Sequence, residues 1–531
     1  MRWSRRTEWW LAGLAFFLPL LFATFTQHAW EDFFITLRTS RNLVEGNGLV
    51  FQPGERLHTF TSPLGVLVPA LGLWISGGSA TGALWFLRLV SALVLAAGVV
   101  LLWRRTASLG LGSLGRFVCF GLILADAKMT DFSINGMETA LLVFFGIWLW
   151  TELASPAGPG TVPLGLAAAG LMWTRPDAVI LGVAMGLPFL LLRPKSESSS
   201  GTRWTVLGRA LLIGAALYLP WLVWAWSYYG TPVPHTIIAK AAYTPPVGLH
   251  GYLMLPLQTL LGRSMLVDLF MPSYWVFGGW PRFLTILAQV LAAVAAFAWM
   301  IPGWALAGRR ASLAVFLGMF YLCSIILFPW YVPPWSLLGA IALGFGADAL
   351  ARRWPKVLPV VRIACALVVV AQAGMWLATA WQMRVQQAVV ETGMRRQIGE
   401  WLGVNARPGE TVFLEPLGYI GYYSRLKTLD FPGLSSAEVV AAVRGGAKSY
   451  AALIEKLQPA WVVLRPVEAA REDFKRRPVL ADYELVKSWD VLPQLEAVTY
   501  LPGRPWNEFE ARFLLYRRKA SAVAPAVSPR R

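Results

Sequence analysis

The chain begins MRWSRRTEWWLAGLAFFLPLLFATFTQ (residues 1–27) and continues, after two residues, with WEDFFITLRTSRNLVEGNGLVF (residues 30–51). The apolar run over residues 9–27 is longer than a signal-peptide core and lacks a small-residue cleavage site, so it predicts a retained membrane span. Two adjacent acids, Glu31 and Asp32, follow this span directly, and a predicted helix with Arg38 and Arg41 comes next. Carboxylates favour helix N-termini, so the acid pair suits a plain helix start as well as a functional site.

The composition indicates a polytopic membrane protein. Of 531 residues, 56% are hydrophobic and 14% are charged, whereas soluble domains carry about a quarter charged residues. A net charge of +18 would suggest nucleic-acid binding in a soluble protein. Here the basic residues fall mainly in short loops between apolar runs, where they set membrane topology, and no nucleic-acid partner is expected.

Apolar runs predict about eleven spans. They cover residues 9–27, 84–103, 112–127, 139–153, 162–174, 177–193, 205–226, 284–306, 312–328, 335–351 and 358–381. The further apolar segment 63–78 is predicted to lie on, or dip into, the outer leaflet. Only then do the basic clusters near residues 5, 104, 193–203, 309 and 352–356 all face the cytoplasm. The N-terminus is therefore predicted to be cytoplasmic, in a multi-pass protein of a bacterial inner (plasma) membrane.

The last 150 residues or so have a different character. Short strand-like segments alternate with helical ones from TVFL (411–414) to YELVKSWDVL (483–492), which predicts a small α/β domain. The expected fold is a polytopic α-helical membrane domain over residues 1–381, with a first external loop at 28–83. A periplasmic or extracellular α/β domain with a disordered tail is expected over 382–531.

Most of the uncommon ionisable residues fall at the predicted outer ends of spans, where they are candidates for function. Apart from the acid pair, they lie in ADAKMTDFSINGMETAL (125–141), TRPDA (174–178) and YYGTPVPHTIIAK (228–240). The first two stretches also suit a helix start and a tight turn, and His58 and His235 also suit interfacial polar positions. Lys240 has no obvious structural reason to be there. No metal-ligand, nucleotide or serine-hydrolase motif is present, so no metal site is predicted.

Taken together, these motifs resemble a known family. The pattern E-D-x-F-I-T-x-R-x-x-x-N-L-x-x-G-x-G-L-V-F over residues 31–51, followed by TSPL (61–64), resembles the first external loop of GT-C glycosyltransferases. The nearest resemblance is to mycobacterial terminal arabinofuranosyltransferases and their bacterial homologues. NGMETAL (135–141), TRPDA, YYGTPVPHTIIAK and GYIGYYSRLKTLDFPGL (418–434) resemble further motifs of that family, in the same order. The chain departs from the pattern at Glu31, Thr39 and His235, and WYVPP (330–334) lacks the family's arginine, so the sugar or acceptor can differ from arabinan.

The resemblance implies an inverting transfer from a polyprenyl-phosphate sugar to an envelope glycan, lipid or protein, under the first external loop. By its place in the motif, Glu31 matches the family's base, and Asp32 is the second candidate for removing the acceptor's proton. Cations must stabilise the leaving phosphate. Lys240 and Arg175 are predicted for this role, followed by Arg38 and Arg41.

Five further polar residues are predicted to line the substrate pocket, namely His58, Glu138, Asp177, His235 and Tyr243. No cofactor is required by this chemistry, and dependence on a divalent metal stays open. Membrane lipids are expected partners. The alternatives are a transporter or flippase of lipid-linked sugars and a noncatalytic scaffold. Within the enzyme class they are an enzyme like the protein O-mannosyltransferases or the lipid A aminoarabinose transferases.

Overall fold

The computed structural model describes residues 5–194, 201–243, 247–324 and 328–520. Its contacts divide the chain into two compact units. Unit 1 comprises residues 1–30, 61–232 and 246–384, and unit 2 comprises residues 31–60, 233–245 and 385–531. The first loop therefore divides, because residues 31–60 pack with the C-terminal part of the chain.

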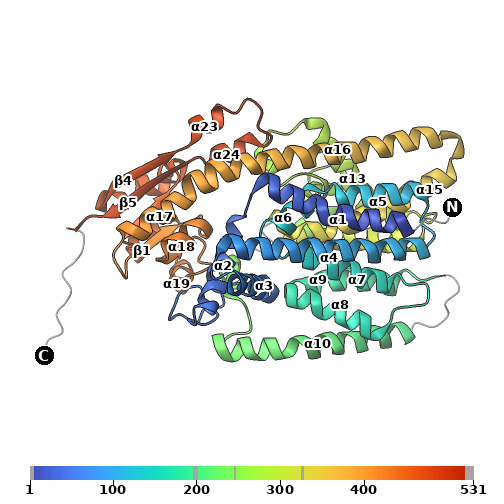
Figure 1. The fold of residues 1–531 in the computed structure, drawn as a ribbon, viewed down its shortest axis with the longest axis horizontal. Helices are drawn as coiled ribbons and strands as arrows, with labels where there is room; N and C mark the ends of the chain where they lie inside the picture. Colours follow the sequence, from blue (N-terminus) through green and yellow to red (C-terminus); the bar gives the residue numbers. More distant parts are fainter. Residues whose placement is uncertain (1–4, 195–200, 244–246, 325–327, 521–531) are drawn as a thin grey trace. The chain divides into compact units, whose positions relative to one another are not determined.

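Unit 1 is helical. Its α-helices are α1 (Arg5–Thr26), α3 (Pro63–Ile75), α4 (Ala80–Ser108), α5 (Ser113–Leu124), α6 (Ala127–Ile134), α7 (Thr139–Leu153), α8 (Thr161–Thr174), α9 (Ala178–Leu191), α10 (Gly201–Tyr229), α12 (Leu249–Leu260), α13 (Arg282–Phe297), α14 (Leu306–Ser324), α15 (Pro333–Arg353) and α16 (Leu358–Gln386). Short 3-10 helices are η1 (Met265–Phe270), η2 (Trp275–Phe277), η3 (Ala298–Met300), η4 (Pro329–Tyr331) and η5 (Pro355–Val357). Figure 1 shows α1, α4, α7, α8 and α10 side by side, and each packs on the next in that order.

Each predicted span corresponds to one of these helices. Within the described residues, 7 helices are long and apolar enough to cross a membrane, or up to 8 if the bent pair α6–α7 counts as one span. Among the described residues, α3, α5, α8 and α9 are shorter apolar helices. A polytopic helical fold is thus confirmed, whereas the number of about eleven spans stays a prediction. Residues 325–328 were the predicted end of one span, and residues 325–327 lie outside the described part.

Unit 2 is built on a five-stranded sheet of order β2-β1-β3-β5-β4. The strands are β1 (Thr411–Leu414), β2 (Lys427–Asp430), β3 (Trp461–Leu464), β4 (Tyr483–Asp490) and β5 (Arg512–Arg518). β1 is parallel to β2 and β3, with Val412 opposite Trp461, while β5 is antiparallel to β3 and β4. The predicted α/β domain is therefore present, although the described residues end at 520, before most of the tail predicted to be disordered.

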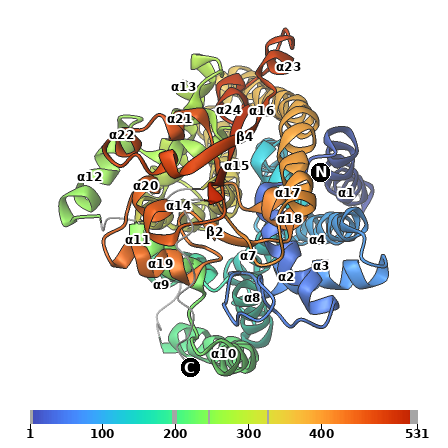
Figure 2. The ribbon, with the colours of Figure 1, turned by 90° about the vertical axis from the view of Figure 1, so that its left-hand side faces the viewer.

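Helices cover both faces of this sheet because the central strands are apolar on both faces. Val412 and Val463 belong to one core cluster and Phe413 and Val462 to another. The helical elements are α2 (Glu31–Val44), α11 (His235–Tyr243), the π-helix η6 (Gln387–Arg395), α17 (Arg396–Asn405), α18 (Gly418–Ser424), α19 (Ala437–Arg444), α20 (Tyr450–Leu457), α21 (Pro466–Ala469), α22 (Glu472–Arg476), η7 (Val479–Asp482), α23 (Leu492–Glu496) and α24 (Arg504–Phe509). Residues of α17 and α18 pack in the first cluster and residues of α19 and α20 in the second, and Figure 2 shows α19 beside α20.

Candidate active site

Glu31, the first residue of α2, lies against the start of α18. Its Oε1 atom accepts hydrogen bonds from the backbone N–H groups of Gly418 (2.5 Å) and Tyr419 (3.2 Å). Such N–H groups at a helix start favour a carboxylate. A Cβ atom on residue 418 would lie 1.9 Å from the carbonyl oxygen of Glu31. Residue 418 must therefore be glycine for α2 to approach this closely.

Two arginines on the same face of α2 also contact α18. Arg38 donates from Nη1 to the carbonyl oxygen of Gly421 at 2.7 Å, and the Arg41 guanidinium lies 4.2 Å from the centroid of the Tyr422 ring. Positions 31, 38 and 41 recur at helical spacing, so they share one face of α2. The motif at 31–51 and the motif at 418–434 are therefore two sides of one packed contact within unit 2.

The buried Arg38 guanidinium donates several hydrogen bonds within unit 2. Besides Gly421, it donates to the carbonyl oxygens of Phe51 (3.1 Å) and Leu426 (2.9 Å) and to Gln52 Oε1 (2.8 Å). Only 1% of its surface is exposed, and burial lowers the pKa of its guanidinium to about 9. These contacts hold residues 51–52 against the C-terminal part of unit 2, and binding a phosphate would require Arg38 to give some of them up.

A buried charge cluster surrounds the other oxygen of Glu31. The Oε2 atom lies 2.6 Å from Nη1 of Arg395. Arg395 also contacts Glu391, at 3.0 Å, and Glu510. Arg465 adds contacts with Glu415, Glu468 and Glu510. Two guanidiniums are thus shared by five carboxylates, which we name the carboxylate cluster: Glu31, Glu391, Glu415, Glu468 and Glu510.

Glu31 holds its proton unusually tightly as a result. Burial raises the pKa of Glu31 to about 8, against the attraction of Arg395, and repulsion from Glu391, Glu415 and Glu510 adds to the increase. Arg395, Glu391 and Glu510 are not among the site residues that the sequence predicts. The available signal was Glu391 and Arg395 at a spacing of four within VVETGMRRQI (389–398), a helical ion-pair spacing.

Asp32 is the next residue of α2 and is half-buried. Successive helical residues are rotated by about 100°, so Asp32 faces a different direction from Glu31. The two acids therefore have different surroundings even though they are adjacent in the sequence.

Helix α11 brings the YYGTPVPHTIIAK motif into unit 2. The N–H group of His235 donates to the carbonyl oxygen of His58 at 2.8 Å, which ties the start of α11 to the first loop. Both histidines are buried. Burial lowers the pKa of His58 to about 4, so its imidazole is neutral at physiological pH.

One face of α11 carries polar atoms that the described residues leave unsatisfied. Thr236, Lys240 and Tyr243 are spaced by four and three residues, so they share a face. The buried Thr236 Oγ1 and Tyr243 Oη atoms, and Nε2 of His235, have no hydrogen-bond partner within the described part of the chain. Burial raises the pKa of Tyr243 to about 12, so it keeps its hydroxyl proton. Buried polar atoms of this kind commonly mark the place of a ligand or water.

In unit 1, NGMETAL and TRPDA meet. Arg175 lies between α8 and α9 and contacts Glu138 Oε1, just before α7, at 3.1 Å. It binds both oxygens of Asp177 at 2.9 Å. Tyr321 donates to Asp177 at 2.8 Å, and Arg175 lies 4.6 Å from the ring centroid of Tyr331. The motif TRPD is thus a turn between helices, and its two charges also form an ion pair with each other.

Lys128 and Asp131, from the same stretch as NGMETAL, are also buried. Lys128 donates to the carbonyl oxygens of Asp268 and Met271, and Asp131 accepts a hydrogen bond from Asn135 at 2.6 Å. These contacts fix the short helix α6 and the 3-10 helix η1. Among the described residues, no group of three or more His, Cys, Asp or Glu side chains is placed to hold a metal ion.

Sequence comparisons give two kinds of match. Residues 380–515 match a family described as a domain of unknown function, DUF8728. The chain is also 31% identical over 234 residues to a terminal β-(1→2)-arabinofuranosyltransferase of Mycobacterium tuberculosis, covering 41% of this chain and 36% of that protein. A terminal β-(1→2)-arabinofuranosyltransferase of Corynebacterium glutamicum is 30% identical over 239 residues, covering 40% of this chain and 33% of that protein. The matched region therefore spans about a third of each relative.

Structural comparison covers nearly the whole chain. ArnT from Cupriavidus metallidurans in the apo state matches with a TM-score of 0.56 and 14% identity, covering 98% of this chain and 100% of that chain. The oligosaccharyltransferase AglB from Archaeoglobus fulgidus, solved with an inhibitory peptide and a dolichol-phosphate, matches with a TM-score of 0.52 and 12% identity. That match covers 98% of this chain and 76% of AglB. The predicted resemblance is confirmed, and the chain has the fold of the GT-C glycosyltransferases.

Proposed function

We propose that this protein is an inverting membrane glycosyltransferase that moves a sugar from a polyprenyl-phosphate donor to an acceptor hydroxyl on the outer side of the membrane. The observation that carries the proposal is the 31% identity to a terminal arabinofuranosyltransferase. A lipid-phosphate donor is supported by the similar fold of ArnT, whose structure has been solved bound to undecaprenyl phosphate.

The proposed reaction needs a base and a stabilised leaving group. The acceptor oxygen attacks the anomeric carbon, the bond from this carbon to the phosphate oxygen breaks, and polyprenyl phosphate leaves with the bonding electrons. A carboxylate takes the acceptor's proton as the new bond forms. The acid pair at the start of α2 supplies the two candidate side chains for this step.

The contacts of Glu31 favour a positioning role. The carboxylate of Glu31 already accepts from two N–H groups and contacts Arg395, so it would have to exchange existing partners to bind an acceptor. We assign Asp32 as the catalytic base and Glu31 as a positioning residue that fixes the start of α2.

Lys240 is the proposed ligand of the donor phosphate. Its support is the face of α11 on which it lies, because Thr236 and Tyr243 on that face have buried hydroxyls without partners among the described residues. A lysine beside such hydroxyls can bind a phosphate through charge and hydrogen bonds. His58 and His235 would line the same region. The roles predicted in unit 1 for Arg175, Glu138 and Asp177 stay predictions, because these side chains bind one another.

The test is a transfer assay on the purified full-length chain in detergent. A panel of polyprenyl-phosphate pentoses and hexoses is offered with envelope acceptors, and the release of polyprenyl phosphate is measured. Loss of a general base costs roughly 10²–10⁴ in rate. We therefore expect Asp32→Asn to lower kcat at least a hundredfold without changing donor binding. Glu45→Gln is the matched control, since Glu45 is an exposed acid after the same helix.

Two results would contradict the assignment. Wild-type turnover by Asp32→Asn would remove it as the base, and loss of turnover in Glu31→Gln alone would transfer that role to Glu31. Donor binding without turnover by the wild-type chain, across the whole panel, would favour a flippase of lipid-linked sugars instead.

A further inference from the structure

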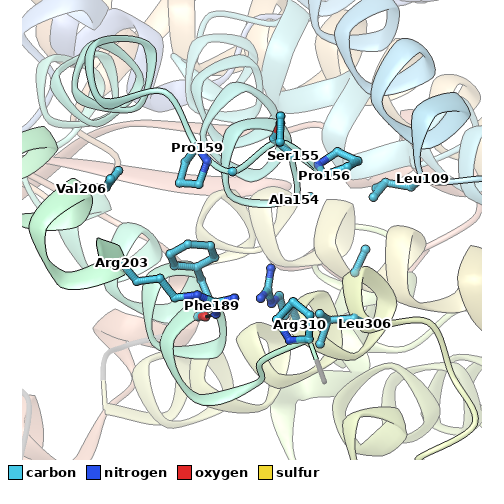
Figure 3. A pocket seen from close by; sticks show the side chains of 14 residues that line it. Leu109, Ala154, Ser155, Pro156, Pro159, Phe189, Arg203, Val206, Leu306 and Arg310 are labelled. Atoms are coloured by element: carbon cyan, nitrogen blue, oxygen red, sulfur yellow. Dashed lines mark hydrogen bonds between the residues drawn. The ribbon is translucent and has the colours of Figure 1, made fainter. Parts of the chain in front are cut away.

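Unit 1 contains a cavity of about 500 Å³. Figure 3 shows Phe189, Arg203 and Arg310 among the side chains that line it. Pro194 also lines it, and residues 195–200, which follow Pro194 in the chain, lie outside the described part. The described residues therefore do not define the charge of this cavity. The π-helix η6 of unit 2, in contrast, is described throughout.

Side-chain bonds between residues five apart distinguish η6 from an α-helix. Gln386 donates to Glu391 Oε1 at 3.0 Å. Gln387 donates to Thr392 Oγ1, also at 3.0 Å. Successive residues of an α-helix are rotated by about 100°, so residues five apart would point about 140° away from each other. A π-helix, whose backbone hydrogen bonds join residues five apart, brings such side chains together. Both bonds therefore depend on the winding of η6.

The apolar residues of this segment follow the same winding. Five of them are buried in one core cluster of unit 2, namely Val385, Val390, Met394, Ile398 and Leu402. The first two are five positions apart and the others follow at steps of four, whereas the buried stripe of an α-helix combines steps of three and four. In an α-helix the last of these side chains would point about 100° away from the first. The sequence therefore specifies a slower turn here.

Gly393 fits this winding because it has no side chain. A Cβ atom on residue 393 would lie 2.9 Å from the carbonyl oxygen of Ala388, five residues earlier, and real Cβ atoms essentially never come closer than 3.0 Å to another atom. Glycine is a poorer α-helix former than alanine. A glycine at this position therefore weakens an α-helix but avoids a clash in the π-helix.

The winding of η6 directs two side chains toward Glu31 and its partner Tyr419. Arg395, the last residue of η6, lies 2.6 Å from Glu31 Oε2. The Gln387 amide lies 3.2 Å from the Tyr419 hydroxyl, and the N–H group of Tyr419 donates to Glu31. All four residues belong to unit 2. Gln387 and Arg395 are eight positions apart, so α-helical winding would turn one about 80° away from the other.

We propose that η6 is a positioning segment of the transferase site and that its winding holds Arg395 against Glu31. The residues that set this winding are Gln386, Gln387 and Gly393. Glu31 in turn fixes the start of α2, where the proposed base is the next residue. The inference rests on the proposed transferase function. Rare π-helical segments occur frequently at functional sites, which is consistent with this role.

Alanine substitutions at two glycines test the winding, because the two kinds of helix predict opposite signs. Gly393→Ala should lower the Tm of the full-length chain in detergent by about 2–12 °C, since the π-helix has no room for the methyl group. If η6 were an α-helix, the same change would raise Tm by about 2–4 °C and would overturn the proposal. Gly374→Ala is the matched control. Gly374 lies in α16, where a Cβ atom meets nothing within 4 Å, so the Tm of this variant should rise or stay the same.

The transfer assay tests the positioning role at a temperature where the variants stay folded. Gly393→Ala should lower kcat at least about tenfold while the KM for the donor changes less than about twofold, because small displacements of catalytic groups reduce rates strongly. Adding Gly393→Ala to Glu31→Gln should lower kcat no further, since the effect passes through Glu31. If Gly393→Ala fails to fold, Gln386→Met, which removes the bond to Glu391, should lower kcat in the same way.

Each other result overturns a stated part of the proposal. An unchanged kcat, or effects of Gly393→Ala and Glu31→Gln that simply multiply, would show that η6 does not act through Glu31. No transfer by the wild-type chain across the donor panel would overturn the proposed function and the positioning role with it. The comparison of Tm values would still decide the winding in that case, so the two failures are distinguishable.

Discussion

Replacing Gly418 with alanine tests the packing of α2 on α18. The added Cβ would lie 1.9 Å from the carbonyl oxygen of Glu31 and 2.7 Å from its carbonyl carbon. Both atoms belong to the backbone, which cannot move aside as a flexible side chain does. Ordinary contacts of a Cβ atom begin at 3.4 Å, so accommodating the methyl group requires the Glu31 backbone to shift by about 1.5 Å.

The cost has two parts. Overpacking of this kind costs about 1–3 kcal/mol, and weakening the bond from Gly418 N–H to the Glu31 carboxylate adds about 1 kcal/mol or more. A loss of roughly 2–4 kcal/mol corresponds to a fall of about 4–16 °C in Tm for a domain of 150–250 residues. Thermal unfolding of the full-length chain in detergent, followed by circular dichroism, measures it.

Gly421→Ala is the matched control within the same helix. A Cβ there meets Leu417 at 3.4 Å, Thr428 at 3.5 Å and Arg38 at 3.6 Å, which are ordinary contact distances. This variant should unfold within about 2 °C of the wild type. If Gly418→Ala and Gly421→Ala have the same Tm, α2 does not pack on α18 as described, and the explanation of the GYIGYYS motif is wrong.

Three further predictions concern charged side chains. Arg395→Gln leaves three buried carboxylates without their shared cation and should cost about 3–5 kcal/mol. Arg396→Gln removes an exposed pair with Glu400 and a contact with the Tyr423 ring, so its unfolding midpoint should fall much less. Because the folded-state pKa of Glu31 is about 8 and its ordinary value is 4.5, the folded chain binds an extra proton between these values. The contribution of Glu31 to stability is complete below about pH 4.5 and lost as pH rises through about 8; Glu31→Gln should flatten this part of the stability–pH curve. Arg175→Lys cannot bind both oxygens of Asp177 and should lower Tm by several degrees, and an unchanged Tm would show that the paired geometry adds nothing.

The sequence predicted the helical fold well because its signal is local. Each apolar run corresponds to a helix, since apolar length and helix length follow from the same residues. The small α/β domain was predictable from alternating strand and helix patterns. The membrane crossings were less certain, because α5, α8 and α9 are shorter than a bilayer requires.

The candidate site was predictable only where a motif carried it. Glu31, Arg175 and Lys240 stand in recognisable stretches, and the structure locates each of them. Arg395 and Glu510 stand 364 and 479 positions after Glu31 in the printed sequence, and nothing local links them to it. Which long-range partners a carboxylate acquires depends on the tertiary fold, so the raised pKa of Glu31 had no sequence signal.

The arrangement of α2 explains why two distant motifs occur in one chain. Trp30 belongs to unit 1 and Glu31 to unit 2, so the acid pair begins where the chain passes from one unit to the other. The contacts that fix it, with Gly418, Tyr419 and Arg395, all come from unit 2. The C-terminal part of the chain therefore sets the geometry of the acids, although they follow the first span in sequence. A change at residue 418 should consequently impair transfer as well as stability, because small displacements of catalytic groups reduce rates strongly. Transfer and unfolding measured on Gly418→Ala at a temperature where it stays folded would separate these two effects.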